Sequence, residues 1–201
     1  MLSEGKLRSL NEFVDKLSRE ELIWINGYIS GKIYSNSLTE SSPHAIPVTK
    51  KFTILYGTDT GNSKKLAVEF SGLSKRDGAK VKVASMDTYK AEALAHESNL
   101  CIIMSTHGDG DPPPSAKKFF NALMSSELKL NKLEYAVLAL GDSSYPYFCK
   151  AGEDVAHRLS ALGAKASIPI QKCDVDYQND ATYWFQNYLK SFAAPEATKV
   201  D

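Results

Sequence analysis

The fold is decided by one stretch of the sequence, Tyr56-Gly-Thr-Asp-Thr-Gly-Asn-Ser63. It follows an apolar run at 52–56, which predicts a buried strand, and it precedes 63–76, where apolar residues recur at helical spacing. A strand, a short loop of hydroxyls and glycine, and a helix start together favour anion binding, because free backbone N–H groups and the positive end of the helix dipole point to one place. We therefore expect a phosphate group here.

The composition of this loop narrows the kind of phosphate. It lacks the Lys of G-x-x-x-x-G-K-[ST], so it is not the loop of an NTP-hydrolysing enzyme. It also lacks G-x-G-x-x-G, the fingerprint of dinucleotide binding. A monophosphate held by neutral donors is the expected guest, which indicates a mononucleotide such as FMN. Taken alone, however, the loop is also compatible with a simple helix N-cap.

Length and charge set broad bounds. The chain has 201 residues, enough for one domain of about 150 residues and an extension. Its 24 basic and 24 acidic residues balance, so no overall field favours binding to nucleic acid or a membrane surface. No apolar run approaches the roughly 20 residues of a membrane span, and the first residues lack the apolar core of a signal peptide.

The cysteines indicate the compartment. Cys101, Cys149 and Cys173 are odd in number and lack the spacing of a metal site, so we interpret them as reduced thiols of a cytoplasmic protein. His107 has no partner at ligand spacing, and no metal is expected.

The chain divides into unequal parts. Two short helices are predicted within residues 5–32, and Ser18-Arg-Glu-Glu21 is a capping box at the start of the second. A polar segment rich in Ser, Thr and Pro follows, which is typical of a linker. The predicted parts are an N-terminal helical extension (1–33), a linker (34–50), the main domain (51–193) and a C-terminal linker remnant (194–201).

The main domain alternates strands and helices. Strands are predicted at 52–56, 80–85, 100–105, 135–140 and 166–170, and helices near 63–76, 88–96, 114–126, 151–162 and 179–192. This order predicts an α/β fold with parallel strands joined by crossover helices. The short apolar strands fit a sheet that is covered on both faces.

Two further loops should lie beside the first one, because ligands of such sheets bind at the carboxyl ends of the strands. The first is Ser105-Thr-His-Gly-Asp-Gly-Asp-Pro-Pro-Pro114, whose glycines permit close approach to a flat ligand. The second is Leu140-Gly-Asp-Ser-Ser-Tyr-Pro-Tyr-Phe-Cys149, in which Tyr145 offers an aromatic plane. Tyr145 and Phe148 are also compatible with roles as core aromatics.

Together the three loops resemble the FMN-binding loops of flavodoxins and, more closely, those of diflavin reductases. The run from Leu140 to Gly152 is similar to the FMN domain of the NADPH–sulfite reductase flavoprotein (alpha component), as are Cys173–Gln178 with Trp184 and the N-terminal stretch Leu17–Tyr28. The resemblance implies a flavodoxin-like, doubly wound sheet of five parallel strands in the order 2-1-3-4-5. It covers nearly the whole chain.

The resemblance also implies a cofactor, FMN, and roles for individual residues. The first loop would hold the phosphate, and the other two would flank the isoalloxazine ring, with Tyr145 stacked on it and Gly108 offering a backbone carbonyl near the ring. The implied FMN-binding residues are Thr58, Asp59, Thr60, Gly61, Asn62, Ser63, Ser105, Thr106, His107, Gly108, Leu140, Gly141, Asp142, Ser143, Ser144, Tyr145, Pro146, Tyr147, Phe148 and Cys149.

No nucleophile–base pair is expected, because the flavin carries the electrons and the protein tunes it. Several acids lie in the three loops and in the segment after the fifth strand: Asp109, Asp111, Asp142, Asp174 and Asp176. Their charges would make reduced FMN a stronger electron donor, and they would also suit docking of a partner. We interpret Cys149 as a packing thiol and not as a redox centre.

For the whole protein, the resemblance implies electron transfer from an FAD- and NADPH-binding reductase domain, on the same or a separate chain, to a sulfite reductase hemoprotein. That hemoprotein carries siroheme and an iron–sulfur cluster and reduces sulfite to sulfide. The N-terminal helices are expected to take part in oligomerisation. The chain itself contains no FAD or NADPH domain, so we interpret it as a truncated piece or a separate FMN subunit without NADPH-dependent activity of its own.

Two alternatives stay open at this stage. One is an FMN domain or free-standing flavodoxin-like carrier that serves another heme or iron–sulfur acceptor. The other is a flavodoxin-like binding module with no redox role, which would be colourless when purified.

Overall fold

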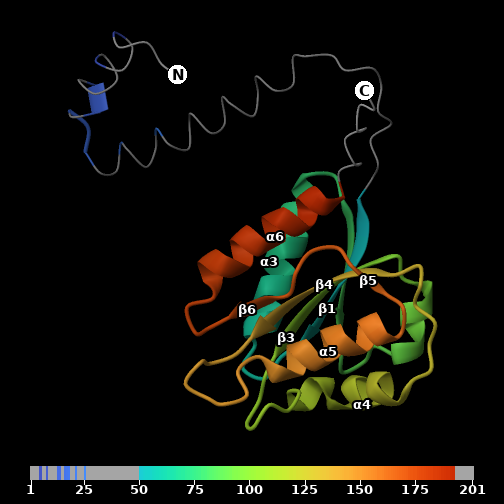
Figure 1. Cartoon of the computed structure of the whole chain (residues 1–201). Coiled ribbons are helices and arrows are strands. Elements are labelled where there is room, and N and C mark those ends of the chain that lie inside the picture. The colour runs from blue at the N-terminus through green and yellow to red at the C-terminus, as the bar shows by residue number, and fades with distance from the viewer. Residues whose placement is uncertain are drawn as a thin grey trace, which may run out of the picture. The chain divides into compact units, whose positions relative to one another are not determined.

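The computed structural model describes residues 50–192 and nine further positions from Gly5 to Ile25. The chain divides into two compact units, Met1–Val48 and Thr49–Asp201, of which the second contains the sheet (Figure 1). Most of the predicted extension (1–33) and linker (34–50), and all of the predicted remnant 194–201, lie outside the described residues. The boundaries of these parts therefore stay predictions.

One feature of the first unit is described. The Ser18 amide donates to Glu21 Oε2 over 2.8 Å, and the Glu21 amide donates to Ser18 Oγ over 3.3 Å. These reciprocal hydrogen bonds satisfy two N–H groups at a helix start, and they confirm the predicted capping box.

A parallel sheet forms the centre of the second unit, with the strand order β2-β1-β3-β4-β5 and with β6 also paired to β4. The register places Ile54 of β1 opposite Val83 of β2 and Cys101 of β3. The predicted order 2-1-3-4-5 is confirmed. The strands are β1 (Lys51–Gly57), β2 (Lys80–Ser85), β3 (Asn99–Ser105), β4 (Glu134–Leu140), β5 (Lys165–Ala166) and β6 (Gln171–Cys173).

The predicted fifth strand at 166–170 is wrong in its extent. β5 pairs with the start of β4 through Ala166 and Tyr135, and β6 pairs with its end through Gln171 and Leu138, so two extra residues bulge out between the pairings. Pro169, in the bulge, has no N–H to give to a ladder. Its carbonyl instead accepts a hydrogen bond from Trp184 Nε1 at 3.1 Å.

Helices α3 (Asn62–Arg76) and α6 (Gln178–Ser191) cover one face of the sheet (Figure 1). Aromatic side chains of the two helices pack against each other above the sheet. Phe70 and Phe185 stack with ring centroids 4.0 Å apart and ring planes 4° from parallel. Strand residues whose side chains point to this face, such as Ile54 and Ile103, are fully buried under them. Burial of this kind contributes about 1.5–3 kcal/mol for each large apolar side chain.

Helices α4 (Lys117–Ser125) and α5 (Lys150–Ala161) cover the other face, together with the short 3₁₀ segments η1 (Ala91–His96) and η2 (Pro114–Ala116). The helical stretch predicted near 88–96 is the 3₁₀ segment η1, which begins only at Ala91 because the backbone of Lys90 before it is extended, with φ −86° and ψ 133°. Within the described residues, none of the helices has the length and apolar character that a membrane span requires.

The contact between α5 and β4 depends on Gly152. A Cβ at this position would lie 2.5 Å from Ala139 Cβ, well inside contact distance. The helix can therefore approach the strand that leads into the loop after β4 only because this residue has no side chain.

Replacing Gly152 with Ala is expected to destabilise the full chain by about 1–3 kcal/mol, the usual cost of overpacking. The matched control is Gly72→Ala in α3, where a Cβ would meet nothing within 4 Å. That change should stabilise the chain by up to about 1 kcal/mol, because Ala favours a helix interior. Urea unfolding measures both; equal stabilities of the two variants would contradict the packing described here.

Candidate functional site

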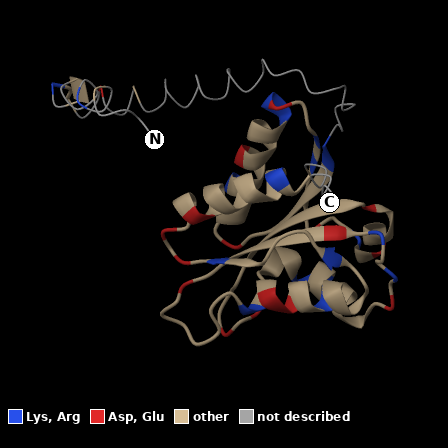
Figure 2. Ribbon diagram, turned by 45° about the horizontal axis from the view of Figure 1, so that its top comes forward, with Lys and Arg blue, Asp and Glu red and all other residues tan. Residues whose placement is uncertain are grey.

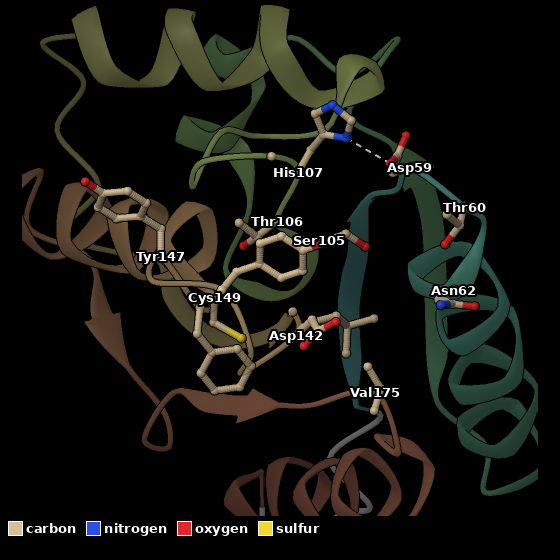
Figure 3. Close-up of a pocket in the computed structure, with 15 residues that line it drawn as sticks. Asp59, Thr60, Asn62, Ser105, Thr106, His107, Asp142, Tyr147, Cys149 and Val175 are labelled. Carbon is tan, nitrogen blue, oxygen red and sulfur yellow. Dashed lines mark hydrogen bonds and ion pairs between the residues drawn. The ribbon is translucent and has the colours of Figure 1, made fainter.

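A cavity of about 470 Å³ lies at the carboxyl ends of β1, β3 and β4 (Figure 3). This volume is in the range of cofactor and ligand sites. Three loops from distant parts of the sequence meet there, as predicted for the edge of a doubly wound sheet. The lining residues are Asp59, Thr60, Asn62, Ser105, Thr106, His107, Gly108, Leu140, Gly141, Asp142, Tyr145, Tyr147, Phe148, Cys149 and Val175.

The first loop leaves the start of α3 without a side-chain cap. Gly61 is the N-cap residue, with φ 96°, and it makes no side-chain cap hydrogen bond. The first bond of the helix ladder comes from the Lys65 amide to the Gly61 carbonyl at 2.9 Å. The amides of the three residues before Lys65 have no carbonyl one turn earlier in the helix, so they are left for an external acceptor. An anion at this place would satisfy them.

Two predicted residues of this loop shape it without lining the cavity. Thr58 Oγ1 accepts the Gly61 amide at 2.9 Å, and the Thr58 carbonyl accepts Ser115 Oγ at 2.6 Å. Ser63 is buried, and its hydroxyl lies 2.7 Å from that of Ser105. These contacts fix the loop to η2 and to the end of β3.

The second loop is a tight turn closed by its own backbone. The His107 amide donates to the Asp111 carbonyl at 2.8 Å, and the Asp111 amide returns a bond to the His107 carbonyl at 3.0 Å. Between them Gly108 and Gly110 have φ values of 51° and 98°, in the region that favours glycine. His107 Nδ1 lies 2.9 Å from Asp59 Oδ2, so a side-chain contact joins the first two loops (Figure 3).

The third loop, between β4 and α5, is organised by Asp142. Its Oδ1 accepts the Ser144 amide at 2.9 Å and the Ser144 hydroxyl at 2.6 Å, which is an Asx-type turn. The carboxylate therefore has partners within its own loop. Ser144 serves the shape of the turn and lies outside the lining of the cavity.

A fourth segment, which follows β6, supports the third loop. The Gly141 amide donates to the Cys173 carbonyl at 3.0 Å, and Ser143 donates its amide and its hydroxyl to the Asp174 carboxylate. The hydroxyl bond of Ser143 is the largest cause that lowers the pKa of Asp174. The segment also brings Val175 to the cavity, a residue that the sequence analysis missed.

Gly141 and Cys149 close the base of the third loop. A Cβ on Gly141 would lie 2.9 Å from the Cys149 nitrogen and 2.9 Å from Phe148 Cδ2, so backbone and ring occupy that space. Cys149 has a left-handed backbone with φ 60° and directs its thiol at the Ala139 carbonyl, 3.3 Å away. This geometry supports the interpretation of Cys149 as a packing thiol.

Aromatic side chains form one side of the cavity. Tyr145 and Tyr147 are more than half exposed there, so Tyr145 is not a core residue. Phe148 is half-buried, and Lys172 Nζ lies 5.4 Å from the centre of its ring. Exposed aromatic planes beside glycine backbone suit a flat ring system.

The structure brings fourteen of the twenty predicted residues into the cavity lining. The remaining six belong to the same loops but lie outside the lining: Thr58, Gly61, Ser63, Ser143, Ser144 and Pro146. Most of them act through backbone conformation or by holding neighbouring residues.

Comparisons with known proteins bear on this site. Residues 54–184 match the family described as Flavodoxin. The chain belongs to the flavodoxin family. Solved flavodoxins share the fold: one from Streptococcus pneumonia TIGR4 has 24% identity and a TM-score of 0.64, covering 71% of this chain and 97% of that one. Flavodoxin 1 from Bacillus cereus has 21% identity and a TM-score of 0.61, covering 70% and 98%.

Curated relatives are longer. The "Sulfite reductase [NADPH] flavoprotein alpha-component" of Shewanella sp. (strain ANA-3) is 39% identical over 94% of this chain and 32% of the relative. The Bacillus subtilis (strain 168) protein of that name is 37% identical over 90% of this chain and 31% of the relative. The predicted resemblance is confirmed, and the chain spans about a third of the length of these relatives.

FMN is the cofactor of this family, and the residues present fit it. Thr106 Oγ1 is one of two buried side-chain polar atoms in the described residues that have no hydrogen-bond partner, and Thr106 lines the cavity. A buried hydroxyl without a hydrogen-bond partner lowers stability by about 1–3 kcal/mol, and a hydrogen bond to a ligand would recover this free energy. The uncapped start of α3 supplies donors for a phosphate, and the aromatic side chains suit the ring.

The thiols around the site should be unreactive in the folded protein. Burial raises the pKa of Cys149 to about 12 and that of Cys173 to about 11, and burial also raises the pKa of Cys101. At pH 8 these thiols are protonated, so iodoacetamide should label them at least about a hundredfold more slowly than in urea-unfolded chain. Mass spectrometry of timed samples measures this. Labelling of Cys149 at equal rates in both states would contradict its burial.

Proposed function

We propose that this domain carries electrons, through bound FMN, from an FAD- and NADPH-binding reductase module to a sulfite reductase hemoprotein that reduces sulfite to sulfide. One observation carries the proposal: three FMN-type loops meet at one cavity in a chain whose similarity to sulfite reductase flavoproteins extends over 94% of its length. The similarity begins before the flavodoxin match at residues 54–184, so it includes more than the FMN-binding loops.

Each loop has a distinct task in this proposal. The amides at the start of α3, with Thr60 and Asn62, bind the phosphate. Thr106 and Gly108 lie along the ring on one side, and Tyr145 and the Gly141 backbone lie on the other. When bound, FMN accepts and donates electrons, so the chain needs no nucleophile or general base of its own.

Two carboxylates, Asp59 and Asp142, line the cavity, and further acidic residues lie in the adjoining loop segments. Figure 2 shows acidic residues in the loops at this end of the sheet. In the sequence, Asp109 and Asp111 lie in the turn after β3, and Asp176 lies in the segment after β6. These carboxylates favour a partner with a basic surface, because complementary charge steers association. They also make reduced flavin a stronger donor, since nearby negative charge opposes a further negative charge.

The partner and compartment complete the proposal. The hemoprotein carries siroheme and an iron–sulfur cluster, and the N-terminal segment, with the apolar residues Trp24, Ile25, Tyr28 and Ile29, takes part in assembly. We place the protein in the cytoplasm, because its three cysteines are free and buried in the structure.

Electron transfer tests the proposal directly. The purified chain is expected to be yellow and to release one FMN upon denaturation. After anaerobic photoreduction, mixing with a sulfite reductase hemoprotein should rapidly restore the absorbance of oxidised flavin and reduce the heme. The FMN-free chain is the matched control and should reduce nothing.

Other outcomes of this experiment are informative. Rapid reoxidation by a P450-type heme protein and not by the sulfite reductase hemoprotein would favour the carrier that serves another acceptor. A colourless chain that does not take up FMN would refute a redox role altogether.

A further inference from the structure

Asp59 poses an electrostatic problem for the proposed phosphate site. It lies in the loop between β1 and α3 and lines the cavity with Thr60 and Asn62. A carboxylate in a phosphate-binding loop has the wrong sign, because like charges repel at short range. The sequence of the loop contains no Lys or Arg that would compensate for it.

The Asp59 carboxylate has a hydrogen-bond partner in another loop. His107 Nδ1 lies 2.9 Å from Asp59 Oδ2, and the two side chains are 51% and 40% exposed. Figure 3 shows the imidazole turned toward Asp59 at the rim of the cavity. The contact spans 48 positions of sequence and joins the loop after β1 to the loop after β3.

His107 is held in this position by its backbone. Its amide and carbonyl both bond to Asp111, and the intervening turn needs the positive φ of Gly108 and Gly110. Gly110 in turn packs close to Tyr147 and Lys150, because a Cβ on it would lie 2.9 Å from Tyr147 Cβ. The imidazole is therefore presented to Asp59 by a rigid turn, which lowers the entropic cost of the contact.

We propose that His107 is a positioning residue for FMN binding: its ring nitrogen hydrogen-bonds the Asp59 carboxylate and so holds the phosphate-binding loop against the loop after β3. This inference rests on the proposed function, because it concerns the same cofactor. In this proposal His107 affects FMN binding through Asp59. The proposal requires no contact between the imidazole and the flavin ring.

A double-mutant cycle separates these two roles. His107→Phe keeps a flat aromatic ring but removes the hydrogen bond to Asp59, and Asp59→Asn removes the carboxylate that accepts it. We expect H107F to weaken FMN binding on the order of fivefold in the native background and less than about twofold in the D59N background.

The measurement is titration of the FMN-free full chain with FMN, followed by quenching of flavin fluorescence. Circular dichroism of each FMN-free variant verifies that it is folded. Asp142→Asn is the matched control, because Asp142 also lines the cavity but bonds to Ser144 and not to His107. In the double variant, the fold-changes in FMN affinity caused by D142N and by H107F should multiply, as expected for two residues that act independently.

Two results would overturn the inference: no loss of affinity in H107F, or the same fold-loss in the native and D59N backgrounds. The second result would assign His107 to a polar contact with FMN itself, which Phe cannot make. Failure of the native chain to bind FMN would instead refute the proposed function, so the two failures are distinguishable.

Discussion

The site depends on the backbone N–H groups at the start of α3, which have no partner in the helix. They arise because β1 ends at Gly57 and α3 begins after Gly61, whose left-handed backbone turns the chain without providing a side-chain cap. In a free helix such donors would face water. Here they face a cavity whose other walls come from two distant loops, so an anion is the group that satisfies them.

The loops around this cavity are fixed by contacts with one another. The Thr106 amide bonds to the Leu140 carbonyl, Ser63 meets Ser105, and His107 meets Asp59. On the far side, the segment after β6 holds the third loop through Gly141 and Ser143. The site is therefore largely preorganised, which reduces the ordering cost when a cofactor binds.

Sequence reasoning succeeded where burial dictates the pattern. The runs that became β1, β3 and β4 are apolar because both faces of the sheet are covered, and their loops carry recognisable motifs. The fifth strand was misjudged because the bulge at Pro169 depends on pairing with two separate parts of β4. Val175 was missed because its segment is held beside the third loop by long-range hydrogen bonds, from Gly141 to Cys173 and from Ser143 to Asp174, which no local sequence pattern predicts. The direction of a side chain in a loop follows no periodicity, so the sequence could not tell that Ser63 and Ser144 lie outside the cavity lining.

Nuclear magnetic resonance of the ¹⁵N-labelled, FMN-free chain tests the central claim most directly. Addition of FMN should shift the amide signals of Asn62, Ser63 and Lys64 strongly, in a one-to-one titration, because these donors acquire the phosphate as their acceptor. Riboflavin, which has the same ring and no phosphate, should leave these three signals nearly unchanged. Shifts confined to other parts of the chain, or no shift at these amides with saturating FMN, would contradict the account.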